Sequence, residues 1–267
     1  MGGVTFRITC SAFLGIALGF LAEPSRAKAG EKTGAKADSG KGHSAPRWDY
    51  VGKAGPKNWG RLAPEFKTCE RGADQSPIDL RDANQGEGDK LRFEYFPSPV
   101  SVFNNGHTVQ MEVEKGSAFE NGRGRYELAQ FHFHTPSEHT LGGKSFPMEV
   151  HLVHKGETGA LAVVGVLMKV GKRHPALDAV FQNMPTQEGN QKAGGLLLNA
   201  NALLPRSGGY YYYPGSLTTP PCSEGVSWHI LKAPIEISQG QLDAFRKLFK
   251  MNARPVAPLS GRVFMEF

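Results

Sequence analysis

The chain has little excess charge beyond its first 47 residues. Its formal net charge is +6, and residues 1–47, with seven Lys or Arg and three acidic residues, account for +4 of it. From Trp48 onward the excess is only +2, too small a basic surplus to indicate a nucleic-acid partner. Internal repeats and further low-complexity breaks are also absent after Trp48. We therefore predict one domain over residues 47–267.

The N-terminal apolar run is too short to span a bilayer comfortably. This run, Phe13–Ala22, follows Arg7 and precedes the small-x-small sequence Ala27–Ala29, an order typical of an export signal. We predict a signal peptide over residues 1–29 and a flexible, low-complexity tail over residues 30–46. The expected location is the periplasm or the medium, without a stable membrane anchor.

Cysteine is scarce, with three residues in the chain: Cys10, Cys69 and Cys222. Cys10 would be removed with the predicted signal. Export would bring the two remaining cysteines into an oxidising compartment, which favours a Cys69–Cys222 disulfide. The alternative is two separate buried thiols, and the export prediction decides between them.

Helical signals are few, and strand signals dominate. Alternating or continuous apolar patterns predict strands at His107–Glu114, Arg125–His134, Glu149–His154 and Ala160–Val170. Asn121-Gly122 is a hairpin-turn signal. Short helices are expected at Pro175–Phe181 and after the capping box Ser238-x-x-Gln241. We predict a mainly β fold, with a large, twisted, mostly antiparallel central sheet and a few short peripheral helices.

The stretch QFHFHTPSEH, Gln130–His139, is the strongest candidate site. Side chains alternate between the faces of a strand, so His132 and His134 share one face with Gln130. A third ligand has to come from another segment, and His151 on the next predicted strand is well placed. Three neutral imidazoles suit zinc and leave one tetrahedral position for water, whose pKa the metal lowers to about 7.

Two other interpretations of these residues remain open at this point. The histidines could be structural residues of a strand edge. Alternatively, His132-x-His134-x-x-x-Glu138 fits the metal motif of the cupin barrels, in which Glu138 would be a ligand of iron or manganese. Spacing alone does not separate these interpretations from a three-histidine zinc site.

Five further motifs give the chain a resemblance to one family. They are QSPIDL (75–80), NNGH (104–107), AVVG (162–165), YPGSLTTPP (213–221) and NARP (252–255). With the histidine segments, they make the chain from about Trp48 to its end strongly resemble an alpha-class carbonic anhydrase of bacterial type. The resemblance implies a zinc enzyme in which zinc-bound hydroxide attacks carbon dioxide to give bicarbonate.

The resemblance also implies a role for particular residues. The metal ligands would be His132, His134 and His151, and their hydrogen-bond partners would be Gln130, the backbone carbonyl of Asn252 and Glu149. Catalytic roles would fall to His107 as proton shuttle, and to Thr218 and Glu138, which orient the hydroxide. The substrate side would comprise Val153, Val163, Leu217, Thr219 and Trp228. Tyr50, Asn105 and Gln110 would hold the proton-path water, and Cys69 and Cys222 match a family disulfide.

Some histidines and partners stay outside this scheme. His139, His154 and His229 are expected to be packed or hydrogen-bonded structural residues, and Tyr213 is the best of the tyrosine run for a hydrogen bond near the site. The sequence is also compatible with a homodimer. A carbonic-anhydrase-like binding module without activity is the remaining alternative, and it predicts a missing ligand histidine.

Overall fold

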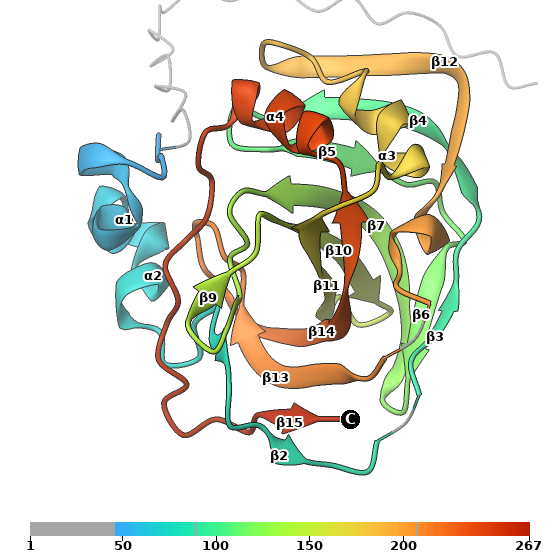
Figure 1. Cartoon of the computed structure of the whole chain (residues 1–267). Helices are drawn as coiled ribbons and strands as arrows, with labels where there is room; N and C mark the ends of the chain where they lie inside the picture. The colour runs from blue at the N-terminus through green and yellow to red at the C-terminus, as the bar shows by residue number, and fades with distance from the viewer. Residues whose placement is uncertain (1–45, 89, 207) are drawn as a thin grey trace, which may run out of the picture. The chain divides into compact units, whose positions relative to one another are not determined.

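β-Strands dominate the part of the chain that the structure, a computed structural model, describes: residues 46–88, 90–206 and 208–267 (Figure 1). The strands are β1 (Asp79–Leu80), β2 (Asn84–Gln85), β3 (Arg92–Glu94), β4 (Pro97–Asn104), β5 (Val109–Glu112), β6 (Ala118–Asn121), β7 (Gly124–His134), β8 (Thr140–Leu141), β9 (Lys144–Ser145), β10 (Met148–Gly156), β11 (Leu161–Val170), β12 (Gly189–Asn199), β13 (Tyr210–Ser216), β14 (Glu224–Ile237) and β15 (Met265–Glu266). The predicted signal peptide and all but one residue of the predicted tail lie outside the described residues.

The helices are short. The α-helices are α1 (Trp59–Leu62), α2 (Thr68–Arg71), α3 (Pro175–Phe181) and α4 (Gln239–Leu248), and the 3-10 helices are η1 (Gly52–Ala54), η2 (Pro56–Asn58), η3 (Pro64–Phe66) and η4 (Ala200–Leu203). In the described residues, no helix is long and apolar enough to cross a membrane.

Most strands belong to one twelve-stranded sheet. Its order is β12-β4-β5-β7-β10-β11-β14-β13-β15-β2; off this path, β6 pairs with β7, and β3 pairs with β6. All described pairs in this sheet are antiparallel except β11 with β14 and β15 with β2. The predicted fold class, a large and mostly antiparallel sheet with short helices, is therefore confirmed.

Strand β11 lies in the middle of the sheet because its side chains are apolar on both faces. Val164 and Val166 join the larger apolar core, whereas Val163 and Leu167 join a smaller core on the opposite face. A strand that is buried on both faces needs this continuous apolar pattern. Gly165 interrupts the run, and a Cβ there would lie 2.6 Å from Cδ1 of Ile230 and 3.0 Å from Oε1 of Glu149, a residue of the candidate site.

Helices α3 and α4 lie together against β4, β5 and β12 and cover the larger core (Figure 1). The capping box predicted for α4 is present: the Ser238 hydroxyl accepts a hydrogen bond from Gln241 N, and the Gln241 side chain accepts one from Ser238 N. Leu242 and Phe245 are buried on the inner face of α4. Pro175 begins α3, as predicted.

The short helices over residues 52–71 were not predicted from the sequence. They have little amphipathic period, and their stability comes from packing around Trp59, which is fully buried in a third apolar cluster. The predicted disulfide is present between Cys69 of α2 and Cys222 of the loop after β13. It joins this helical segment to the loop that carries Thr218 and Thr219.

Candidate metal centre

A cavity of about 170 Å³ opens on the face of the sheet formed by β5, β7, β10 and β11. It is lined by Trp48, Tyr50, Asn105, His107, Thr108, Gln110, Gln130, His132, His134, His151, Val153, Val163, Leu217, Thr218, Thr219 and Trp228. Every residue of the predicted proton path and substrate wall is in this lining, whereas Glu138, Glu149 and Asn252 are buried behind it.

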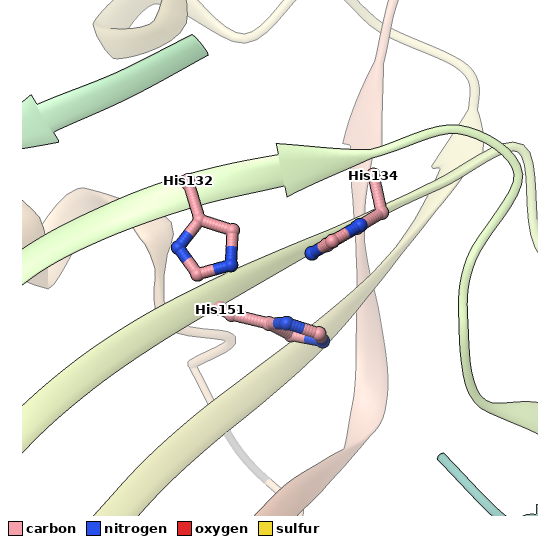
Figure 2. Close-up of side chains that lie close together, drawn as sticks. All are labelled: His132, His134 and His151. Carbon is pink, nitrogen blue, oxygen red and sulfur yellow. The ribbon is translucent and has the colours of Figure 1, made fainter. Parts of the chain in front are cut away.

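Three imidazole rings converge at the bottom of the cavity. Strand β7 contributes His132 and His134, and the neighbouring strand β10 contributes His151, as Figure 2 shows. The antiparallel register pairs His151 with His132 directly. Because residues two apart on a strand share a face, the register brings all three rings to one side of the sheet. One nitrogen from each ring lies within 4.8 Å of the others.

The hydrogen bonds of His132 and His134 decide which nitrogen of each ring is free to bind a metal. Nδ1 of His132 lies 2.9 Å from Oε1 of Gln130, and Nδ1 of His134 lies 2.7 Å from the backbone oxygen of Asn252. Both partners are acceptors, so each Nδ1 carries the proton and each Nε2 keeps its lone pair. Nε2 of His134 is buried without a hydrogen-bond partner among the described residues, which is costly unless a ligand occupies it.

The third ring is turned the other way. Nε2 of His151 lies 3.0 Å from Oε1 of Glu149, at ion-pair distance although the alignment is outside that of a regular hydrogen bond. The carboxylate favours the proton on Nε2, so Nδ1 keeps the lone pair that faces the cavity. Three neutral imidazoles with converging lone pairs are a donor set that suits zinc. The residues present therefore fit a zinc ion.

Burial and charge set the protonation of these groups. Burial, and then the neighbouring His134 and His151, lower the pKa of His132 well below its usual value. Burial also lowers the pKa of His134. For His151, burial is the largest single influence and acts downward, but the charge and hydrogen bonding of Glu149, together with the charge of Glu138, outweigh it and raise the pKa. The pKa of Glu149 is held well below its usual value despite burial, because His139 and His151 face its carboxylate.

Glu138 lies beside the ligands with one oxygen unsatisfied. Its Oε1 accepts a hydrogen bond of 2.9 Å from the backbone N–H of Arg254. Its Oε2 lies 3.5 Å from Nε2 of His134 and 3.8 Å from Nδ1 of His151, and it has no hydrogen-bond partner among the described residues. Thr218 lines the same cavity, but the structure has no hydrogen bond from Thr218 to Glu138. Their expected partnership stays a prediction.

Behind the ligands, a buried hydrogen-bond chain holds Glu149 in place. The backbone N–H of His139 donates to Oε2 of Glu149 (2.9 Å), and Nδ1 of His139 lies 2.7 Å from Oε1. Nε2 of His139 lies 2.6 Å from the hydroxyl of Tyr213, which donates to Ser76. The expected hydrogen bond of Tyr213 near the site is thus present, and His139 supports the partner of a ligand rather than the ligand position itself.

The other two histidines that were expected to be structural lie elsewhere. Nε2 of His154 is 2.8 Å from the hydroxyl of Tyr95, and Nε2 of His229 is 3.2 Å from Nδ2 of Asn121. Both rings pack edge-on against Phe119. They are buried on the face of the sheet opposite to the cavity and take no part in the site.

His107 stands in the cavity lining on the turn between β4 and β5. Oδ1 of Asn105 accepts hydrogen bonds from the backbone N–H groups of His107 (3.0 Å) and Thr108 (2.8 Å), so this side chain builds the turn. The His107 ring stacks on Trp48, with ring centroids 3.6 Å apart and an interplanar angle of 11°. Burial lowers the pKa of His107, and the charges of Asp49 and Glu188 oppose that shift.

One side of the cavity is apolar. Val163 and Trp228 are nearly fully buried, and Val153 and Leu217 pack against the same cluster. The indole N–H of Trp228 donates to the backbone oxygen of Ser216, which leaves its ring face against His151 and His139. This wall offers a small apolar molecule a surface with few hydrogen-bonding groups.

Two residues of the site were missed in the sequence, and for His139, which was expected to be a hydrogen-bonded structural residue, the partner was not predicted. Trp48 and Thr108 line the cavity, and His139 supports Glu149. The hydroxyl of Thr108 donates to the backbone oxygen of Phe133 between the ligands of β7. The only sequence signal that marked Trp48 was its position, as an aromatic residue, at the start of the predicted domain. The contacts of all three residues depend on chain segments that are distant in sequence.

The fold and the site together define a class: a large, mostly antiparallel sheet with three histidines that could hold a metal at the base of a partly apolar cavity. The family model of eukaryotic-type carbonic anhydrase matches residues 54–265. A carbonic anhydrase of Nostoc sp. is 41% identical over 225 residues, covering 82% of this chain and 85% of that protein. One of Neisseria gonorrhoeae is 42% identical over 221 residues, covering 82% of this chain and 87% of that protein.

A solved structure supports the same assignment. The alpha carbonic anhydrase of Thermovibrio ammonificans, in complex with the inhibitor sulfanilamide, has a TM-score of 0.80 and 43% identity, and the match covers 83% of this chain and all of that one. The chain belongs to the eukaryotic-type, or alpha, carbonic anhydrase family. The prediction of an enzyme of the carbonic anhydrase class is thereby confirmed, and the cupin interpretation is wrong.

Proposed function

We propose that the protein catalyses the reversible hydration of carbon dioxide to bicarbonate and a proton, with zinc as cofactor. The observation that supports this most directly is the set of three imidazoles whose free nitrogens lie within 4.8 Å of one another at the base of the cavity. His132, His134 and His151 would hold the ion. When bound, zinc supplies a Lewis acid that makes hydroxide available at neutral pH.

The hydrogen-bond partners of the three ligands keep them in the reactive tautomers. Gln130, the carbonyl of Asn252 and Glu149 each occupy the nitrogen that faces away from the cavity. This arrangement orients the rings before the metal binds, so little ordering is required on binding. In our proposal, His139 stabilises the Glu149 carboxylate and thereby the orientation of His151.

The apolar wall of Val153, Val163, Leu217 and Trp228 would hold carbon dioxide next to the metal position. Carbon dioxide has no hydrogen-bond donor and only weak acceptors, so an apolar surface binds it without an unpaired polar group. Thr219, on the polar side of the cavity, would contact the charged product.

Thr218 and Glu138 would orient the nucleophile. The unsatisfied Oε2 of Glu138 would accept the Thr218 hydroxyl proton. Once that hydroxyl donates to Glu138, its oxygen can only accept, so it would hold the proton of the nucleophile away from the substrate carbon. In other enzymes, the loss of one positioned hydrogen bond to a reacting oxygen raises the activation barrier by about 2.7–4 kcal/mol.

His107 would carry the released proton to solvent. An imidazole changes its charge near neutral pH, and His107 lies in the lining of the cavity that holds the three ligands. Tyr50, Asn105 and Gln110 line the same cavity and would hold the water along the proton path. We also propose that the protein is exported, since the Cys69–Cys222 disulfide is typical of oxidising compartments.

Metal analysis and stopped-flow hydration of carbon dioxide test this function together. We expect one zinc per chain, and hydration activity that is lost on chelation, restored by zinc and blocked by a sulfonamide. Tightly held iron or manganese without zinc-dependent hydration would refute the proposal. Zinc binding without hydration would favour the binding-module alternative.

A further inference from the structure

The sheet register brings Glu188 next to the turn that carries His107. Glu188 directly precedes β12, whose first residue, Gly189, pairs with Asn104 at the end of β4. The Asn104 side chain donates to the backbone oxygen of Pro185 (2.9 Å), which fastens the preceding loop to the same place. A Cβ on Gly106 would lie 2.6 Å from Oε1 of Glu188. The carboxylate therefore lies against the residue that precedes His107.

A second carboxylate approaches His107 from the N-terminal segment. Asp49 stands between Trp48, which stacks on the His107 ring, and Tyr50, which lines the cavity. Oδ1 of Asp49 accepts a hydrogen bond of 2.6 Å from Tyr50 N. The charges of Asp49 and Glu188 both act to raise the pKa of His107.

We propose that Asp49 and Glu188 form an acidic pair that stabilises the protonated imidazole of His107 and so keeps this residue competent to accept a proton from the cavity. This inference rests on the proposed function, because it assigns two positioning residues to the proton relay.

The physical reason is a balance between burial and charge. Stacking under Trp48 removes water from the ring and disfavours imidazolium, which lowers its pKa. A relay group whose pKa falls too far below that of its proton donor accepts the proton slowly. The charges of Asp49 and Glu188 counter this loss. Both are exposed, so salt screens their effect over a Debye length of about 8 Å at physiological ionic strength.

The test measures the titration midpoint of His107 directly. Ring resonances of ¹³C-labelled histidine are followed against pH in the zinc-loaded protein, and His107→Ala identifies the signal. The variants are Glu188→Gln, Glu188→Lys and Asp49→Asn. Glu157→Gln is the matched control, because it removes the same charge from an exposed turn between β10 and β11. Zinc content checks that each variant is folded.

We expect a lower midpoint in Glu188→Gln and Asp49→Asn, a still lower one in Glu188→Lys, and the parent midpoint in Glu157→Gln. The differences should shrink at high ionic strength, and turnover in weak buffer should fall in the same order. Unchanged midpoints in all three variants would overturn the acidic pair. If His107→Ala instead turns over at the parent rate in weak buffer, the shuttle role in the proposed function fails, whatever the midpoints are.

Discussion

Reduction of the Cys69–Cys222 disulfide should destabilise the protein by several kcal/mol. The bridge joins residues 153 apart in sequence, so it removes much of the conformational freedom of the unfolded chain. The chain-entropy relation gives about 17 cal/mol/K for a loop of this length, or about 5 kcal/mol at 25 °C. Residual structure in the reduced, unfolded chain lowers this figure, so we expect a loss of about 3–5 kcal/mol.

The folded site should persist when the bridge is reduced, because other bonds hold the same segments. Gln75 Nε2 donates to the backbone oxygen of Cys222 (3.2 Å), and Arg254 donates to that of Cys69 (3.0 Å). The N–H of Cys222 donates to Thr219 O (2.8 Å), which closes the loop next to Thr218. We therefore expect a large change in the free energy of unfolding but little change in the zinc content of the folded protein.

Urea unfolding, followed by tryptophan fluorescence, measures the difference between the oxidised protein and the protein reduced with a phosphine. The double variant Cys69→Ala/Cys222→Ala is the control: its stability should be low and insensitive to the reductant. A reduced protein whose free energy of unfolding lies within about 1 kcal/mol of the oxidised one would refute the loop-entropy reasoning. So would a double variant that responds to the reductant as the parent does.

Three other predictions concern the ligands, the nucleophile and pH. His132→Ala should lose zinc and activity, whereas the control His174→Ala, outside the cavity, should keep both; an active, zinc-replete His132→Ala would contradict the ligand assignment. Thr218→Ala should keep zinc but lower kcat/KM by about a hundredfold, or about 2.7 kcal/mol, and an unchanged kcat/KM would exclude the orienting role. Burial lowers the pKa of His154 to about 3 and that of His229 to about 4. The unfolded-state pKa of each ring is about 6.5, so below that pH only the unfolded chain takes up these protons. The free energy of unfolding therefore decreases as the pH falls toward the folded-state pKa values, by about 1.4 kcal/mol per pH unit for each ring. We expect the free energy of unfolding of His154→Gln, measured with urea, to fall less steeply than that of the parent between pH 6 and pH 4. An equally steep fall would contradict this explanation.

Local patterns were enough to predict four neighbouring strands of the sheet, β5, β7, β10 and β11. The alternation in Arg125–His134 and the continuous apolar run in Ala160–Val170 correspond to β7 and β11, and the turn signal at Asn121-Gly122 lies at the β6–β7 hairpin. The helices of residues 52–71 escaped prediction because their order comes from burial of Trp59 and from the disulfide, neither of which leaves a periodic pattern.

The sequence by itself determined that His132 and His134 share a face, since side-chain alternation is a property of the strand backbone. It also favoured a Cys69–Cys222 disulfide, and a family resemblance supplied the remaining roles. Only the tertiary structure decided which groups surround the ring nitrogens. The register of β7 with β10 pairs His151 with His132, and the chain end brings the carbonyl of Asn252 to His134.

The support of the site and the rim of the cavity depend on the tertiary structure in the same way. His139 meets Glu149, Trp48 stacks on His107, and Glu188 reaches the same turn because β12 pairs with β4. These contacts join segments that lie apart along the chain, and the packing of the whole sheet sets their distances. Local residue preference has no influence on those distances, so no pattern in the sequence predicted them.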